Sequence, residues 1–377
     1  MKVCDVVLNS IWYDPRVRKQ INEYLAHGVD VCCVGFRCDR YDEEKVAAIP
    51  CPTTITSLPK NLNGKQRGIF RKLARERKRD QLMCDAIVAC RPDIIHANDL
   101  TGLIPAYKAS KKLKCKLVYD SHEICTENLF LKGNPLYAWL LRVQEKCICK
   151  RIDRMICVSN AAAEYFENEY HIPKPTVITN CTLKAEQCFE APKNEGFEIL
   201  NHGQFYAGRG YDILVEAAAL LKDYPDIKLA MRGFGKMERQ LRDRVAALQA
   251  ENVRFYPPVL VQELISHAAR SMVGVAMTED ICLNFKLSVS NKLFEYAAAG
   301  LPVIMSDIPE HRYLNKQYEF GVILSENTPQ AFAEAVVRLY TDKPFYAMCA
   351  ENAKKMSAEV NWENEFSALI SWERDQL

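Results

Sequence analysis

The stretch SNKLFEYAAAGLPVI, residues 290–304, contains a helix and the strand that follows it. Ser290 or Asn291 can cap the helix at its start, and Gly300 stands where a glycine commonly ends one. Pro302 then opens a short apolar run, as expected for a buried strand. A helix followed at once by a buried strand is a building unit of α/β proteins.

The same alternation extends outward from this stretch along the chain. Apolar runs predict strands at residues 3–8, 29–36, 94–96, 116–119, 155–158, 176–179, 197–201, 228–232, 253–255, 273–277, 303–305 and 322–324. Helical spacing of apolar residues predicts helices at residues 17–26, 73–89, 103–110, 136–150, 161–169, 212–221, 237–249, 261–269, 291–299 and 329–339, with a further helical stretch at the C-terminus. Because the strands are nearly continuous apolar runs, we expect parallel sheets covered by helices on both faces.

We therefore predict an α/β protein of two doubly wound, parallel-sheet domains that face each other across a cleft. The length of 377 residues also favours two domains. Residues 184–196 show no periodicity and contain Pro192, Asn194 and Gly196, so we predict that they form the linker. The domains are then residues 1–183 and 197–359.

Composition and cysteine content place the chain in a cell compartment. No run approaches about 18 uncharged apolar residues, and the N-terminal segment MKVCDVVLN is too short for a signal peptide. The 16 cysteines do not suit a small disulfide framework, and their spacing lacks the paired knuckles of a zinc site. We expect reduced, mostly buried thiols, no metal site and a cytoplasmic protein.

The distribution of charge suggests a second feature of the first domain. The net charge of +2 argues against a nucleic-acid-binding protein. Residues 1–190 nevertheless carry 30 basic and 23 acidic side chains, against 20 and 25 in the remainder. Much of the excess lies in the basic segment from Lys60 to Arg79, which contains one acidic residue, Glu76. This segment is either a helix that contacts an anionic membrane or a solvated helix face.

Two parts of the second domain are suited to binding phosphate. A predicted strand ends at Gly203, and the loop QFYAGRG (residues 204–210) precedes the next helix, so free backbone N–H groups and Arg209 can meet an anion. Lys292 lies in the first turn of a helix, where a cation opposes the dipole unless an anion is bound beside it. Glu295 is one turn further on, and its carboxylate can accept two hydrogen bonds from vicinal ribose hydroxyls. The chain contains neither a GxGxxG nor a Walker motif.

These residues resemble the large family of retaining glycosyltransferases with the GT-B fold, commonly called family 4. In the first half the resemblance rests on DPRV (14–17), LAHGVDV (25–31), DIIHAND (93–99), LVYDSHE (117–123), DRMICVS (153–159) and VITN (177–180). In the second half it rests on residues 203–210 and 292–304. The resemblance implies that the first domain binds the acceptor, that the second binds the nucleotide sugar, and that the final helix, about residues 360–377, packs back on the first domain.

The resemblance also implies roles for individual residues. It assigns His122, Arg209, Lys292 and Glu295 to the reaction, with His122 meeting the transferred sugar. It assigns donor binding to Gly203, Gln204, Arg209, Gly233, Asn284, Ser290, Asn291, Lys292, Leu293 and Glu295. It assigns acceptor binding to Asp14, Arg16, His96 and Asp99. Two departures from the family pattern are Leu287, where a second glutamate is usual, and Gln204, where an arginine is common.

The resemblance predicts a metal-independent enzyme that needs no cofactor. Its reaction is the transfer of a hexosyl or related sugar, with retained configuration, from a UDP- or GDP-sugar to a glycan or lipid-linked acceptor in cell-surface polysaccharide biosynthesis. Positive charge on Arg209 and Lys292 would stabilise the departing diphosphate. Two alternatives remain, a sugar-nucleotide 2-epimerase of the same fold and a non-catalytic partner that binds a sugar nucleotide. The sequence predicts no oligomeric state.

Overall fold

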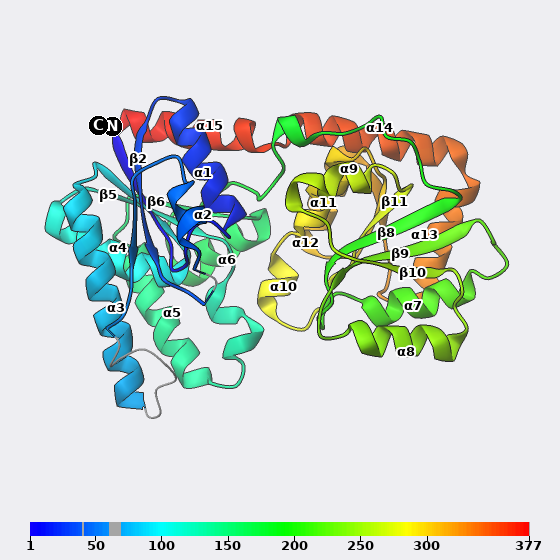
Figure 1. Ribbon diagram of the computed structural model, residues 1–377, viewed down its shortest axis with the longest axis horizontal. Coiled ribbons are helices and arrows are strands. Elements are labelled where there is room, and N and C mark those ends of the chain that lie inside the picture. Colours follow the sequence, from blue (N-terminus) through cyan, green and yellow to red (C-terminus); the bar gives the residue numbers. More distant parts are fainter. Residues whose placement is uncertain (40, 60–68, 377) are drawn as a thin grey trace. The chain divides into compact units, whose positions relative to one another are not determined.

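The computed structural model describes residues 1–39, 41–59 and 69–376, which fold into two compact units (Figure 1). Unit 1 contains Met1–Ile178 together with the chain from Glu365 onward, and unit 2 contains Thr179–Asn364. Each unit is built around one parallel β-sheet with helices packed on it. The prediction of two doubly wound, parallel-sheet domains is therefore confirmed.

Unit 1 has a seven-stranded sheet in the order β3-β2-β1-β4-β5-β6-β7 among the residues described. Its strands are β1 (Lys2–Val6), β2 (Asp30–Phe36), β3 (Thr53–Thr56), β4 (Ile94–Asn98), β5 (Lys116–Ser121), β6 (Arg154–Cys157) and β7 (Thr176–Val177). Its helices are α1 (Pro15–Ala26), α2 (Glu43–Ala47), α3 (Ile69–Cys90), α4 (Asp99–Leu113), α5 (Pro135–Cys149) and α6 (Asn160–Tyr170), with short 3₁₀ turns at Cys125–Glu127 and Leu129–Leu131. The last helix of the chain, α15 (Trp362–Asp375), also contributes to this unit.

Unit 2 has a six-stranded sheet in the order β10-β9-β8-β11-β12-β13. Its strands are β8 (Phe197–Gln204), β9 (Ile227–Phe234), β10 (Val253–Tyr256), β11 (Val273–Ala276), β12 (Val303–Met305) and β13 (Gly321–Ile323). Its helices are α7 (Tyr211–Leu220), α8 (Glu238–Leu248), α9 (Leu264–Ala268), α10 (Leu283–Leu287), α11 (Asn291–Ala298), α12 (Pro309–Tyr318), α13 (Pro329–Thr341) and α14 (Lys343–Glu359), with 3₁₀ turns at Lys184–Glu186 and Val261–Glu263.

Local sequence explains where several helices begin. Asp14 accepts a hydrogen bond from the backbone N–H of Val17, and Pro15 occupies the first turn of α1, where no N–H is needed. Asn134 and Pro135 repeat this arrangement at the start of α5.

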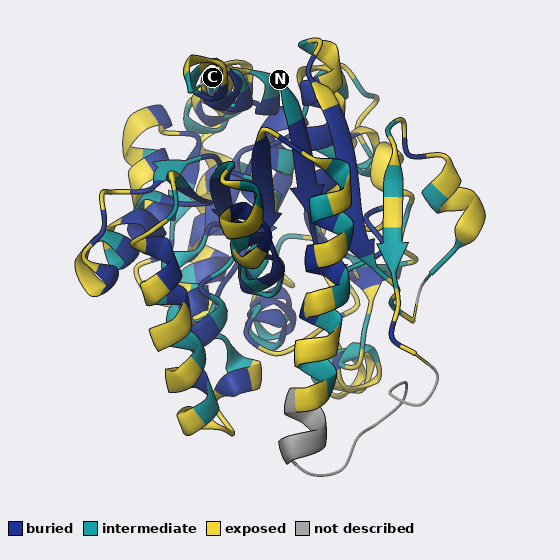
Figure 2. Cartoon of the chain, turned by 90° about the vertical axis from the view of Figure 1, so that its left-hand side faces the viewer, coloured by how far each residue is buried: buried dark blue, intermediate teal, exposed yellow. Residues whose placement is uncertain are grey.

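The cores lie between the sheets and their helices. In Figure 2 the central strands of unit 1 are buried, whereas the edge strand β3 is partly exposed and the helices have exposed outer faces. α15 covers one side of this core, where Phe366 packs against Tyr24 with 5.2 Å between ring centroids. No helix in the described part of the chain is both long and apolar enough to cross a bilayer.

The segment predicted to be the linker is packed against unit 2. The Lys193 ammonium donates to the backbone oxygens of Ala269 and Ser271, both at 2.8 Å, and the Asn194 N–H donates to the Arg270 carbonyl at 2.8 Å. Residues 184–196 are thus part of unit 2 in this structure, and the chain changes unit a few residues earlier, after Ile178.

Candidate functional site

Each sheet has one point at which its strand order reverses. In unit 1 this switch lies between β1 and β4, and in unit 2 it lies between β8 and β11. Connections leave such neighbouring strands in opposite directions, so the chain leaves room for a ligand at the carboxyl ends of the strands. Several predicted site residues lie at or near the carboxyl ends of strands, among them His122 in unit 1 and Gly203 and Gly233 in unit 2.

In unit 2, two glycines bring adjacent strand ends close together. Gly203 and Gly233 are register partners on β8 and β9, and both have positive φ, +125° and +152°. A Cβ on Gly233 would lie 1.8 Å from the Gly203 carbonyl oxygen, so a side chain is excluded there. The Cα of Gly203 faces the Lys292 side chain, because a Cβ placed there would be 3.5 Å from the lysine Cε.

Lys292 reaches back from the first turn of α11 over the end of β8. Its ammonium donates to Asn201 Oδ1 at 2.6 Å and lies 5.7 Å from the centre of the Tyr211 ring. Burial, together with the nearby positive charge of Arg209, lowers the pKa of Lys292 to about 7. The free protein therefore holds this lysine in an environment that opposes its charge.

Arg209 supplies the second cation and is held by aromatic side chains. Its guanidinium donates to the Tyr206 hydroxyl from Nε (3.0 Å) and from Nη2 (2.8 Å). The same group lies 4.9 Å from the centre of the Phe285 ring. These contacts fix the arginine on the loop before α7, beside the lysine.

Glu295 is oriented by a histidine that the sequence analysis did not single out. His202 Nε2 lies 2.7 Å from Glu295 Oε2, and the histidine ring packs against Tyr296 with 4.6 Å between centroids. The Tyr296 hydroxyl accepts from the His202 backbone N–H and donates to the Leu200 carbonyl. Two polar atoms at this place, Asn201 Nδ2 and His202 Nδ1, are buried without a hydrogen-bond partner among the described residues.

The other predicted donor-binding residues lie at different depths. Ser290 is the N-cap residue of α11 without a side-chain cap hydrogen bond, and Asn291 beside it is exposed. Leu293 and Asn284 are buried, whereas Gln204 is exposed. Leu287, which replaces the usual glutamate, is the last residue of α10.

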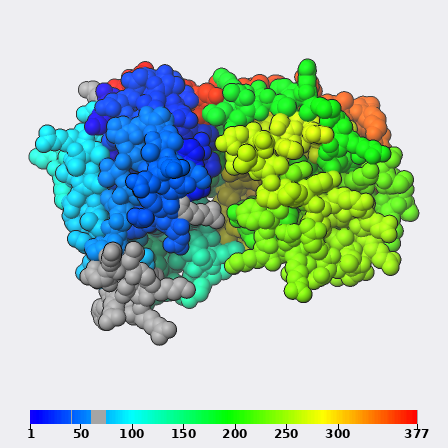
Figure 3. Space-filling view, in the orientation of Figure 1, coloured from blue at the N-terminus to red at the C-terminus, as the bar shows by residue number. Residues whose placement is uncertain are grey.

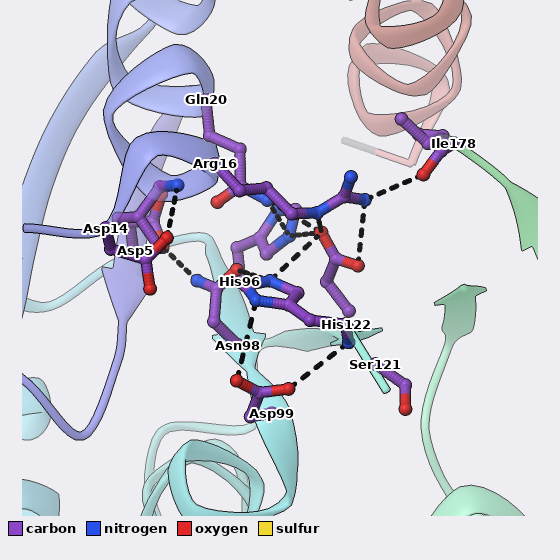
Figure 4. Close-up of polar contacts among 12 residues, drawn as sticks. Asp5, Asp14, Arg16, Gln20, His96, Asn98, Asp99, Ser121, His122 and Ile178 are labelled. Carbon is purple, nitrogen blue, oxygen red and sulfur yellow. Dashed lines mark hydrogen bonds and ion pairs between the residues drawn. The ribbon is translucent and has the colours of Figure 1, made fainter. Parts of the chain in front are cut away.

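In unit 1, His122 follows the carboxyl end of β5 and lies close to Asn98 at the end of β4 and to the Asp99 carboxylate (Figure 4). His122 Nε2 donates to Asn98 Oδ1 at 3.0 Å, and the His122 backbone N–H donates to Asp99 Oδ1 at 3.2 Å. Asn98 in turn donates to the buried carboxylate of Asp5. Burial raises the pKa of both Asp5 and Asp99. His122 keeps 17% of its side chain exposed and can therefore meet a ligand.

A buried ion pair lies directly behind this histidine. Arg16 binds Asp120 through two nitrogens, at 2.9 and 3.0 Å, and also donates to the Ile178 carbonyl (Figure 4). Burial alone would raise the pKa of Asp120, but the charges of Arg16 and His122 hold it well below its usual value. The Gln20 amide donates to the same carboxylate at 2.7 Å.

The four predicted acceptor-binding residues differ in what they can contact. Arg16 and His96 are 2% and 0% exposed, so their side chains are enclosed by protein. His96 packs between Gln20 and Tyr24, whose hydroxyl lies 2.9 Å from His96 Nδ1. Asp14 and Asp99 are partly exposed. Direct acceptor contact stays a prediction for all four.

Several residues of these sites were not predicted, namely Asp5, Asn98, Asp120, Asn201, His202 and Tyr211. Most of them share one signal, a polar residue at or near the carboxyl end of an apolar strand. Such residues are costly to bury, and they meet only because neighbouring parallel strands end on the same edge of a sheet.

Comparisons with known proteins agree with this geometry. The family model described as Glycosyltransferase Family 4 matches residues 16–182, and the one described as Glycosyl transferases group 1 matches residues 184–356. EpsD of Bacillus subtilis (strain 168), which is provisionally assigned as a glycosyltransferase, is 25% identical to this chain over 274 residues. These residues are 66% of this chain and 67% of EpsD.

Two solved structures illustrate the likeness in fold. Sucrose-phosphate synthase from Thermosynechococcus elongatus gives a TM-score of 0.79 at 16% identity, over 100% of this chain and 99% of that chain. HepE from Anabaena, in complex with UDP and glucose, gives 0.73 at 16% identity, over 100% of both chains.

The two parallel α/β sheets and these neighbours define a protein of the GT-B fold. The chain belongs to the glycosyltransferases of the group 1 and family 4 type, whose two family models together match most of its length. It is therefore a transferase of sugar groups, and the family resemblance of the sequence is confirmed.

Proposed function

We propose that this enzyme transfers a sugar from a nucleoside diphosphate to a glycan or lipid-linked acceptor and retains the anomeric configuration. The observation that carries the proposal is the pair of cations at the end of β8. Burial and the neighbouring charge of Arg209 lower the pKa of Lys292. A diphosphate bound between the two cations would supply the negative charge that stabilises both. HepE, a neighbour in fold, was solved with UDP and glucose, which supports this choice of donor.

The rest of the donor site suits the nucleoside. His202 holds one carboxylate oxygen of Glu295, so the carboxylate is oriented before a ribose arrives. Gly203 carries no side chain, and a Cβ there would lie 3.5 Å from Lys292 Cε, so its absence leaves space beside the lysine for a phosphate. UDP and GDP both carry the diphosphate and the ribose that these groups would bind.

The chemistry needs no metal in this proposal. Lys292, Arg209 and the backbone N–H groups before α7 stabilise the charge that develops on the departing diphosphate. An oxygen of that diphosphate accepts the proton of the acceptor hydroxyl on the same face, so no protein nucleophile forms a bond to the sugar. His122, oriented by Asn98, contacts the transferred sugar in this proposal.

Transfer, epimerisation and binding alone can be distinguished in one assay. A panel of UDP- and GDP-sugars is first screened by thermal shift, because a ligand bound to the native state raises Tm. The donors that bind are then incubated with and without polyprenyl-phosphate-linked and oligosaccharide acceptors, and the products are analysed by NMR. Acceptor-dependent transfer with the donor's anomeric configuration supports the proposal. Inversion, or 2-epimerisation without acceptor, refutes it.

We also propose that unit 1 contacts an anionic membrane at the cytoplasmic face. The basic segment that first suggested this extends from Lys60 to Arg79, and residues 60–68 lie outside the described residues. The supporting observation is on α5, where Leu136, Trp139, Leu140 and Val143 recur at helical spacing and are 41–67% exposed. Four such residues on one face exceed the isolated apolar side chains that are usual on a surface.

Exposed basic side chains lie on α3, the helix that α5 contacts through Tyr137. The Tyr137 hydroxyl of α5 donates to Glu76 of α3, and Arg77 and Lys78 next to that glutamate are exposed. In Figure 3 the teal segment that contains α5 reaches the surface of unit 1. An apolar helix face with adjacent cations favours the interface of anionic lipids.

Sedimentation with liposomes tests the contact. We expect binding to vesicles of anionic lipid, weaker binding at high salt, and a loss of at least fivefold in the Leu136→Ser/Trp139→Ser variant. Leu260 and Val261 of unit 2 are also exposed, at 67% and 66%, so Leu260→Ser/Val261→Ser is a matched control. If both variants sediment with the vesicles as the wild type does, α5 does not form the membrane contact.

A further inference from the structure

Three cysteines far apart in the sequence meet on one face of the unit 1 sheet. The Sγ atoms of Cys4, Cys32 and Cys90 all lie within 4.8 Å of one another. Cys4 on β1 and Cys32 on β2 are register partners, so their side chains point to the same face of the sheet. Cys90 is the last residue of α3, which covers that face.

The simplest explanation is that these thiols only fill space in the core. It explains Cys4 and Cys32, which are 0% and 3% exposed. It does not explain why the partly exposed Cys90 places its sulfur beside the other two. A second thiol pair offers a comparison: Cys33 Sγ lies 3.3 Å from Cys51 Sγ, and this contact contains two sulfurs rather than three.

The distances suit a metal–thiolate centre. Metal–sulfur bonds of about 2.3 Å place the sulfurs of a tetrahedral or trigonal site about 3.8–4.0 Å apart. Sulfurs that already lie within 4.8 Å need to move by about an ångström or less to reach this geometry. Rotation about the Cα–Cβ bond of Cys90, at the end of a helix, supplies such a movement most easily.

The chemistry of the ligands selects the kind of ion. The group consists of thiols alone in the described part of the chain, and thiolates favour soft ions such as Cu(I), Zn(II) and Cd(II) over Mg²⁺ or Ca²⁺. Three thiolates around a divalent ion leave a net charge of −1, and the ammonium of Lys2 acts favourably on the thiolates of Cys32 and Cys90. The open side at Cys90 leaves space for water as a fourth ligand of Zn(II) or Cd(II).

We propose that Cys4, Cys32 and Cys90 form a binding site for one thiophilic metal ion. Each thiol that binds releases its proton to solvent, and no electron is transferred. The bound ion would connect β1, β2 and α3 and would therefore stabilise unit 1. It would not take part in sugar transfer, because His122 and Asn98 lie at the carboxyl ends of the strands, whereas Cys90 precedes the start of β4.

Cadmium titration of the full-length, reduced protein tests the site. Thiolate ligation of Cd²⁺ gives a charge-transfer absorbance in the ultraviolet, and competition with a chelator gives the affinity. We expect one tight equivalent in the wild type and at least a tenfold loss of affinity in Cys90→Ser. Cys51→Ser is the matched control, because it removes a thiol from the two-sulfur contact. It should bind like the wild type.

Thermal unfolding gives a second measurement on the same proteins. Zn²⁺ and Cd²⁺ should raise the Tm of the wild type and of Cys51→Ser but not that of Cys90→Ser. If Cys90→Ser unfolds during purification, Cys90→Ala serves in its place, since the residue is at a partly exposed helix end. Equal affinities in the wild type and the Cys90 variant, or loss of binding in Cys51→Ser, would overturn the proposal. So would a wild-type protein that binds no metal when fully reduced.

Discussion

At the scale of single residues, both candidate sites contain ionisable groups whose pKa values the fold shifts. Lys292 is partly discharged, Asp5 and Asp99 have raised pKa values, and Asp120 has a lowered one. Asp99 also adopts a positive φ of +58°, which is uncommon outside glycine. Shifted pKa values and backbone strain cluster at functional sites because a ligand can relieve them.

The roles of Lys292 and Glu295 lead to the first prediction. Lys292→Ala and Glu295→Ala should each lower donor affinity or turnover by at least tenfold, about 1.4 kcal/mol, because each removes a contact to the diphosphate or the ribose. Donor titration and transfer kinetics measure the change. Lys286→Ala is the control, since this exposed lysine on α10 pairs with Asp280 at 2.9 Å. Wild-type kinetics in both site variants would reject the assignment.

The pKa of Lys292 makes diphosphate binding depend on pH. A bound diphosphate raises this pKa above its free value of about 7. Below pH 7 the lysine is already protonated, so affinity is at its maximum. Between pH 7 and 9 binding must take up a proton, and the Kd should rise by up to about tenfold per pH unit. Calorimetry in two buffers of different ionisation enthalpy measures the proton uptake, and Lys292→Ala should show neither effect. A Kd for the wild type that stays constant over this range would contradict the prediction.

At the scale of elements, strand ends and helix starts position every group at the two sites. Gly233 is the most restrictive glycine in the described part of the chain, since a Cβ there would lie 1.8 Å from the Gly203 oxygen. We predict that Gly233→Ala separates the ends of β8 and β9, destabilises unit 2 by about 1–3 kcal/mol and weakens diphosphate binding. Gly133→Ala is the control because a Cβ there meets nothing within 4 Å. Denaturant unfolding and UDP titration measure both effects, and equal behaviour of the two variants would be incompatible with the close approach.

Much of the order of elements could be predicted from the sequence, because buried parallel strands are continuous apolar runs. The structure begins α11 at Asn291 and β12 at Val303, as the stretch at residues 290–304 indicates. β3, α2, α10 and α12 were not predicted. β3 is the sequence TTIT at the edge of the sheet, with little buried surface, and α10 has five residues, too few for a periodic pattern.

The sites were predicted less completely than the strands. Lys292, Glu295, Arg209 and Gly203 lie close together, as the family resemblance implies. Contacts such as His202 with Glu295 join residues that are 93 positions apart, and no local pattern reveals them. The same limit applies to Cys4, Cys32 and Cys90, whose sequence spacing resembles no metal motif although their sulfurs converge.

At the scale of the whole molecule, each unit has its own sheet, and in unit 1 a buried ion pair makes stability depend on pH. The Arg16–Asp120 pair connects α1, β5 and the end of unit 1 at Ile178. The lowered pKa of Asp120 contributes stability that is present above its unfolded value of about 4 and is lost as the pH falls further.

This ion pair gives the last prediction. Arg16→Met should destabilise unit 1 by about 3–5 kcal/mol, because it leaves the buried Asp120 carboxylate without its partner. Unit 2 should unfold as in the wild type. Arg242→Met is the control, since the Arg242–Glu238 pair on α8 is exposed and such pairs contribute little. Calorimetry that resolves two transitions measures the change, and an unchanged transition for unit 1 would show that the pair is dispensable.

The most direct measurement is a crystal structure of the enzyme with whichever of UDP and GDP binds more tightly. We expect diphosphate oxygens to lie within about 3 Å of Lys292 Nζ and the Arg209 guanidinium. We also expect the Glu295 carboxylate to accept hydrogen bonds from the ribose. A nucleotide bound elsewhere, or one whose diphosphate contacts neither cation, would contradict it.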